Sequence, residues 1–103
     1  MTILEFTDKQ KTPIKISQIL ANSCEDVRLT SSESIAFMGS GLDGIKIVNI
    51  ENKSSPNVLE TLSLGIYPWM LTIEKYNNYD FLFVTAREKL NFLTLNVTNV
   101  NNP

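Results

Sequence analysis

A glycine-rich segment is the first feature of the sequence that could bind a ligand. Residues 39–44 read Gly-Ser-Gly-Leu-Asp-Gly, which matches the G-x-G-x-x-G pattern of dinucleotide-binding loops. That pattern needs a helix next, because the amides of the helix N-terminus bind the pyrophosphate. Residues 45–50, Ile-Lys-Ile-Val-Asn-Ile, are strongly β-forming instead. We therefore expect no nucleotide cofactor, and we interpret the segment as a hairpin loop whose glycines adopt positive φ angles.

Acidic side chains are the second candidate for chemistry. Glu25, Asp26, Asp43 and Glu88 fall in or beside loops that the strand order places on one face. Calcium needs about six to eight converging oxygen ligands, so we interpret these residues as separate solvated charges and predict no metal site. The chain contains no histidine, which excludes imidazole acid–base catalysis and a Ser-His triad within it. Carboxylate-only hydrolysis stays open, but no pair of carboxylates is singled out, and we predict no catalytic residues.

Three residues have the chemistry of a protein-binding site. Tyr67, Trp69 and Arg87 are expected near the same face, and Trp, Tyr and Arg dominate the energetics of protein interfaces. We predict that they bind a partner. The alternative is structural: Trp69 would open a strand and pack between neighbouring sheets, and Tyr67 would shape the loop before Pro68.

Cys24 is the single cysteine, so a disulfide within the chain is impossible. No His or Lys lies close in sequence to lower its pKa, and we expect a small buried apolar residue rather than a reactive thiol. The glycosylation sequons at Asn52 and Asn96 do not establish secretion, because a chain rich in Asn, Ser and Thr produces such sequons by chance.

The strands that must position these residues are indicated by a sequence pattern that occurs three times. A strand reaches a proline through a polar turn at residues 1–13, 45–56 and 92–103. The strands begin 44 and then 47 residues apart, in the range where one repeat is one four-stranded propeller blade. Apolar residues nowhere recur at helical spacing for long enough to predict a helix.

The repeat predicts an all-β fold of antiparallel four-stranded blades of a β-propeller, with about two and a quarter blades present. Residues 1–20 would supply the third and fourth strands of one blade, residues 21–64 a complete blade, and residues 65–103 the first three strands of the next. In that last unit, residues 69–73 are expected as a strand and residues 76–80 as the turn after it. A small β-sandwich is the alternative.

The three strand segments of this pattern, called strand boxes below, resemble the repeats of the LVIVD-repeat family. The matching segments are residues 1–5 (Met-Thr-Ile-Leu-Glu), 45–49 (Ile-Lys-Ile-Val-Asn) and 92–96 (Phe-Leu-Thr-Leu-Asn), each followed at short distance by a proline. The closing Asp of the family's pattern is Glu in the first box and Asn in the other two, and Asn can still accept the backbone hydrogen bond of an Asx-type turn. The resemblance covers nearly the whole chain. It implies a β-propeller and a cell-surface or secreted protein, and it brings no catalytic or cofactor-binding residues.

Composition narrows the range of partners. The chain has 103 residues, is 43% apolar and 19% charged, and carries a formal net charge of -2, as expected for a globular domain with a small core. Lys and Arg are scattered singly, so we expect no nucleic-acid partner. The longest apolar stretch, Ile66 to Leu71, is too short to span a bilayer. The first residues do not form a signal peptide, and the compartment stays undetermined.

We therefore expect a non-catalytic repeat segment that serves as a protein-interaction or structural scaffold and belongs to a longer propeller. Its partners would be another protein, further propeller blades, or copies of itself that associate through open blade edges. The alternative is a segment of a propeller enzyme whose catalytic residues lie on blades not present here. A third interpretation is a wall component of a cell-surface array that has no discrete ligand.

Overall fold

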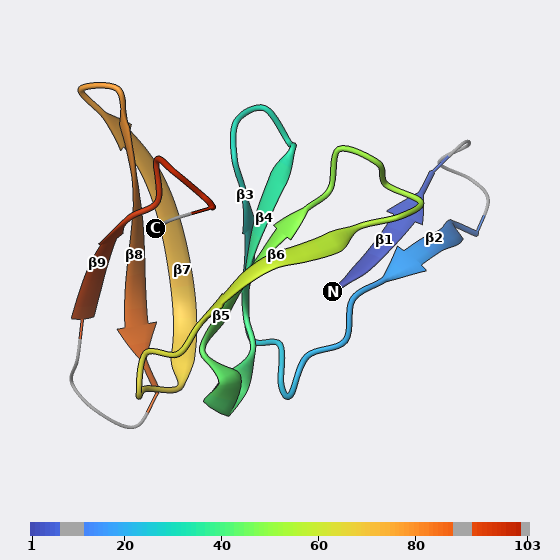
Figure 1. The fold of residues 1–103 in the computed structure, drawn as a ribbon. Coiled ribbons are helices and arrows are strands. Elements are labelled where there is room, and N and C mark those ends of the chain that lie inside the picture. The colour runs from blue at the N-terminus through green and yellow to red at the C-terminus, as the bar shows by residue number, and fades with distance from the viewer. Residues whose placement is uncertain (7–11, 88–91, 102–103) are drawn as a thin grey trace.

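The computed structural model describes residues 1–6, 12–87 and 92–101, which form strands joined by turns and one short 3₁₀ helix (Figure 1). The elements are β1 (Thr2–Glu5), β2 (Ile14–Gln18), β3 (Val27–Leu29), β4 (Ile35–Gly39), η1 (Gly41–Asp43), β5 (Ile45–Asn49), β6 (Asn57–Leu62), β7 (Pro68–Tyr76), β8 (Tyr79–Ala86) and β9 (Phe92–Asn96). The prediction of an all-β fold is confirmed. Within the described ranges, no helix is long and apolar enough to cross a membrane.

The strands form three antiparallel sheets, and in each sheet hydrogen-bonded neighbours are consecutive along the chain. Sheet I contains β1 and β2, sheet II contains β3 to β6, and sheet III contains β7 to β9. Sheet II lies between the other two (Figure 1). Sheet I is therefore a hairpin, sheets II and III are meanders, and loops connect one sheet to the next.

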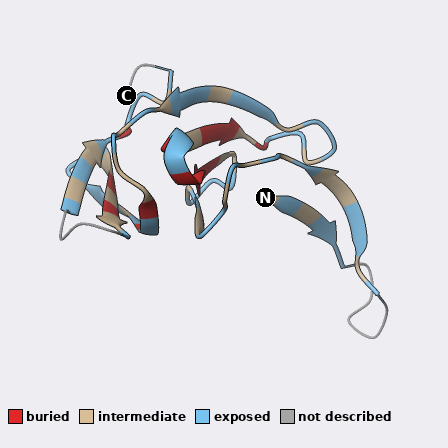
Figure 2. Ribbon diagram, turned by 90° about the horizontal axis from the view of Figure 1, so that it is seen from below, coloured by how far each residue is buried: buried red, intermediate tan, exposed pale blue. Residues whose placement is uncertain are grey.

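The main core lies between sheets II and III. On the side of sheet II it contains the fully buried Phe37, Ile45 and Ile47, and on the side of sheet III it contains Leu71, Leu82 and Val84. Side chains alternate between the two faces of a strand. Ala36 and Val48 therefore point the other way and form a second cluster against sheet I. The two central strands of sheet II, β4 and β5, are thus buried on both faces, and they are mostly red in Figure 2.

The glycine-rich segment forms the turn between β4 and β5. Gly41 and Gly44 have φ angles of 56° and 94°, a region that favours glycine. A Cβ atom on Gly44 would also overlap the carbonyl oxygen of Leu62. The interpretation as a hairpin loop with positive φ angles is confirmed, and the glycines here shape a turn.

The asparagines that close two of the strand boxes make the expected turns. Asn49 Oδ1 accepts a hydrogen bond from the backbone N–H of Glu51 at 2.9 Å, and Asn96 Oδ1 accepts one from Thr98 at 3.1 Å. The same Asx turn thus follows β5 in sheet II and β9 in sheet III.

The β7–β8 hairpin is longer than predicted. The expected strand at 69–73 runs from Pro68 to Tyr76, and the expected turn at 76–80 contains only Asn77 and Asn78 between the strands. Both asparagines have positive φ angles, 47° and 66°, as a two-residue type I′ hairpin turn requires. The turn therefore leaves Tyr76 and Tyr79 inside the strands, and β7 extends well beyond its neighbour β3.

Candidate functional site

The three residues predicted to bind a partner lie together. The guanidinium carbon of Arg87 is 5.3 Å from the centre of the Tyr67 ring and 5.2 Å from that of the Trp69 ring. Both distances are within cation–π range. The backbone N–H of Arg87 also donates to the carbonyl oxygen of Tyr67 at 2.9 Å. We call these residues the aromatic–arginine cluster.

The hairpin register explains why the cluster forms. Pro68 at the start of β7 pairs with Ala86 at the end of β8, so Tyr67 and Arg87 lie side by side at one end of sheet III. A bulge between Pro68 and Met70 interrupts the alternation of side chains there. Trp69 remains 41% exposed, so it is not enclosed between sheets II and III.

A glutamate fastens the cluster to sheet II. The Tyr67 hydroxyl donates to Oε1 of Glu25 at 3.2 Å, and the Ser23 hydroxyl donates to the same oxygen at 3.0 Å. The cluster combines a planar cationic donor with the exposed ring of Trp69 and the half-buried ring of Tyr67. Residues of these types are enriched at protein-binding surfaces.

The other acidic candidates are dispersed. Asp43 accepts a long hydrogen bond of 3.4 Å from the Ser40 hydroxyl, and Glu88 lies outside the described residues. In the part of the chain that the structure describes, no group of three His, Cys, Asp or Glu side chains could hold a metal ion.

Asp26 joins the edge strands of sheets II and III. Its Oδ2 atom accepts the backbone N–H of Leu71 at 2.9 Å and lies 3.4 Å from Nε of Arg28. Nε of Arg28 donates in turn to the Leu71 carbonyl oxygen at 2.7 Å. Two side chains of sheet II thus satisfy both backbone groups of one residue in β7. The sequence interpretation of Asp26 as a solvated loop charge is wrong, because it forms this contact between sheets.

Cys24 is exposed, so the prediction of a small buried residue is wrong. It lies in the irregular segment between β2 and β3, and its Sγ atom is 3.9 Å from the carbonyl oxygen of Asp26. Its thiol is therefore open to solvent in the folded chain.

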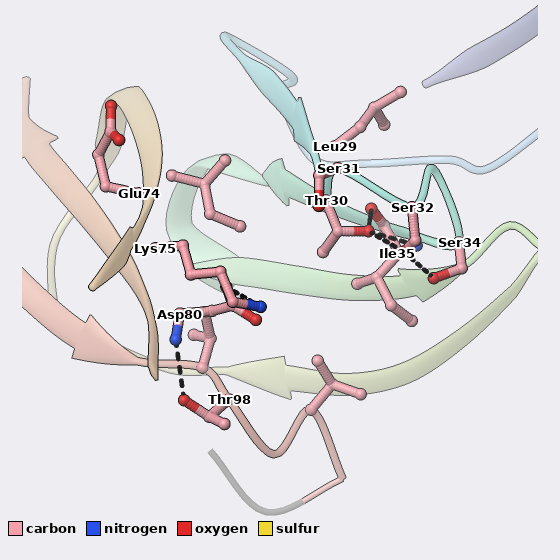
Figure 3. Close-up of a pocket in the computed structure, with 13 residues that line it drawn as sticks. Leu29, Thr30, Ser31, Ser32, Ser34, Ile35, Glu74, Lys75, Asp80 and Thr98 are labelled. Atoms are coloured by element: carbon pink, nitrogen blue, oxygen red, sulfur yellow. Dashed lines mark hydrogen bonds and ion pairs between the residues drawn. The ribbon is translucent and has the colours of Figure 1, made fainter. Parts of the chain in front are cut away.

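A cavity of about 520 Å³ lies at the other end of the sheets, between the β3–β4 hairpin, β7 and the segment after β9 (Figure 3). Its apolar side chains are Leu29, Ile35, Ile73, Val97 and Val100. Its hydroxyl groups come from Thr30, Ser31, Ser32, Ser34 and Thr98, and its charged groups from Lys75 and Asp80. Glu74 borders the cavity, but its carboxylate points away (Figure 3). We call it the interhairpin cavity. No sequence pattern singles it out, because its lining residues come from segments far apart in the chain.

The hydroxyls of the interhairpin cavity are held by one another. The Thr30 and Ser32 hydroxyls are 3.1 Å apart, and those of Ser32 and Ser34 are 2.7 Å apart. Lys75 and Asp80 form a loose ion pair of 3.9 Å across the β7–β8 hairpin. The cavity thus has an apolar floor and an ordered polar rim, the usual composition of a ligand-binding pocket.

In comparisons with known proteins, no family model matches the chain, and neither a curated protein nor a solved structure matches it significantly.

Proposed function

We propose that this chain is a non-catalytic repeat segment of a longer β-propeller of LVIVD-repeat type, and that it serves as a protein-interaction or structural scaffold. The aromatic–arginine cluster of Tyr67, Trp69 and Arg87 is the proposed contact for a protein partner. The three strand boxes lie on β1, β5 and β9, which supports a common repeat.

The observation that carries the proposal is a repeated pairing register. Phe37 of β4 pairs with Ile47 of β5, and both side chains are fully buried between sheets II and III. In sheet III, Phe83 of β8 pairs with Thr94 of β9. These two pairs occupy equivalent positions, but the second lies on the outer face of sheet III. The face of sheet II that packs on sheet III is therefore equivalent to the outer face of sheet III, which packs on no sheet among the described residues.

A backbone contact repeats in the same way. The N–H of Ile50, just after β5, donates to the Ser34 carbonyl oxygen at 2.8 Å. The N–H of Val97, just after β9, donates to the Asp80 carbonyl oxygen, also at 2.8 Å. In each sheet the chain leaving the third strand is thus tied to the hairpin of the first two strands. This contact supports treating sheets II and III as two copies of one unit.

The outer face of sheet III has the apolar surface that such a role needs. Met70, Tyr76, Tyr79 and Phe92 are 55%, 69%, 51% and 62% exposed, and Phe92 stacks on Phe83 with ring centres 5.8 Å apart. At about 200 Å² for each large side chain, these four leave roughly 500 Å² in water. Exposed apolar patches of this size are often functional, which supports an interaction at this face.

Light scattering over a range of protein concentrations tests the proposal. We expect the purified chain to associate as its concentration rises, because the outer face of sheet III packs on another sheet. Phe92→Lys should suppress this association, since it removes a large exposed aromatic ring from the face and replaces it with a charge. The matched control Leu42→Lys removes a leucine that is 78% exposed in η1, far from that face, and should not. A wild-type chain that stays monomeric at high micromolar concentration would contradict the proposal and favour a self-contained β-sandwich.

A further inference from the structure

The second half of β7 has no neighbouring strand on its free edge among the described residues. β7 is the edge strand of sheet III and has nine residues, whereas its neighbour β3 in sheet II has three. Where β3 ends at Leu29 the chain turns away through the β3–β4 hairpin, and the two hairpin tips diverge (Figure 1). The second half of β7 therefore borders the interhairpin cavity and not another strand.

Along β7, the backbone N–H and C=O groups of successive residues point alternately toward β8 and toward the free edge. The N–H and C=O of Leu71 point away from β8, since they bond to Asp26 and Arg28. In an antiparallel pair this orientation recurs every second residue, so Ile73 and Lys75 present their N–H and C=O on the same edge. Among the residues that the structure describes, none makes a hydrogen bond to these four groups on that edge.

The side chains of Asp26 and Arg28 show how this edge is satisfied. A carboxylate oxygen takes the N–H of Leu71 and a guanidinium N–H takes its C=O, so the two side chains replace the acceptor and donor of a neighbouring strand. The next positions, Ile73 and Lys75, lie beside the cavity and need the same pair of partners at strand spacing.

We propose that a peptide segment in extended conformation binds along the edge of β7 at Ile73 and Lys75 and places an apolar side chain in the interhairpin cavity. The backbone of an extended peptide offers donors and acceptors that repeat at that spacing, as in strand addition to a sheet edge. Its inward side chain meets the apolar floor formed by Leu29, Ile35 and Val100.

The same geometry selects the neighbouring side chains of the peptide. Successive residues of an added strand face opposite sides of the sheet. Those next to the apolar residue therefore lie on the outer face of sheet III, beside the exposed carboxylate of Glu74. Lys75 and Asp80 already pair with each other, so Glu74 is the charge left to complement. The peptide accordingly alternates apolar and basic residues.

This inference goes beyond the proposed scaffold function, because the peptide binds the backbone edge of β7 and the interhairpin cavity and reaches the outer face of sheet III only beside Glu74, whereas the proposed sheet packing is centred on Phe83 and Phe92. Either can fail while the other holds. The edge site also differs from the aromatic–arginine cluster, which lies at the opposite end of β7.

A nuclear magnetic resonance titration of the full chain with a capped peptide of alternating valine and lysine tests the proposal. The amide signals of Ile73 and Lys75 should shift most, and those of Thr72 and Glu74, which bond to β8, should shift less. A peptide with N-methyl groups on the amides that face β7 should bind about tenfold more weakly, because two hydrogen bonds are lost. Replacing its lysines by glutamate should weaken binding about threefold through Glu74.

Two pairs of variants localise the effect. Lys75→Pro removes the edge N–H but no bond to β8, whereas Lys75→Ala removes only the side chain; the first should weaken binding several-fold more than the second. Ser32→Trp should block the cavity, and the control Ser55→Trp, in the loop after β5, should not.

Several outcomes would overturn the proposal. Equal binding of the N-methylated peptide, no shift at millimolar peptide, or shifts centred away from β7 would each reject a backbone-paired ligand. Shifts of Ile73 and Lys75 that depend on protein concentration without peptide would show that a second copy of the chain occupies the edge instead.

Discussion

Replacing Asp26 by alanine should destabilise the fold more than its partly exposed position suggests. Leu71, whose N–H Asp26 accepts, is only 1% exposed, so water cannot easily replace the lost acceptor. Leaving a buried N–H unsatisfied costs about 1–3 kcal/mol. The ion pair with Arg28 adds only about 0.2–1 kcal/mol, because the Arg28 side chain is 47% exposed and solvent screens the pair. Together these give an expected loss of about 1–4 kcal/mol in the free energy of unfolding.

Urea denaturation followed by circular dichroism measures this loss. In a thermal melt, at about 4–8 °C per kcal/mol for a domain of this size, the melting temperature should fall by roughly 5–30 °C. Asp26→Asn keeps an oxygen acceptor for Leu71 and loses only the charge, so it should cost about 1 kcal/mol. Asp43→Ala is the matched control: Asp43 accepts one long bond from Ser40 and should cost less than about 0.5 kcal/mol. If Asp26→Ala were no more destabilising than Asp43→Ala, the contact between β3 and β7 would not hold the sheets together.

Three further predictions concern the loops. Gly44→Ala should cost at least about 2 kcal/mol, because its φ of 94° and the Leu62 carbonyl oxygen exclude a Cβ atom; Gly65→Ala, which has open space around it, should cost less in the same urea assay, and equal costs would contradict the steric argument. The exposed thiol of Cys24 should react with a thiol reagent in the native chain as fast as in urea, and protection until unfolding would refute its exposure. Replacing Tyr67 and Arg87 together by alanine should abolish partner binding while lowering the melting temperature by no more than about 5 °C; unchanged affinity would reject the aromatic–arginine cluster as the binding site.

Local features of the fold could be predicted from the sequence. The β5 box alternates around a buried core, the glycines of residues 39–44 mark a tight turn, and Asn49 and Asn96 accept the bonds of Asx turns. These features depend on residues close together in the chain, where backbone sterics and side-chain reach decide the outcome. The length of β7 was underestimated because Asn77 and Asn78 complete a turn by themselves.

Contacts between distant segments were harder to predict. The bond from Leu71 to Asp26 joins residues 45 positions apart, and neither residue type signals it. Cys24 was expected to be buried from its residue type, but its place in an irregular segment leaves it exposed. The interhairpin cavity arises from the unequal lengths of β3 and β7, which only the hairpin register determines. The partner-binding prediction named the residues of the aromatic–arginine cluster, but not that Arg87 contacts both rings.

A crystal or electron-microscopy structure of the associated chain is the most direct test of the scaffold account. The account predicts a further sheet about 10 Å from sheet III, the usual spacing of stacked sheets, with aliphatic side chains packed on Phe83 and Phe92. An assembled particle in which the outer face of sheet III remains in solvent would contradict it.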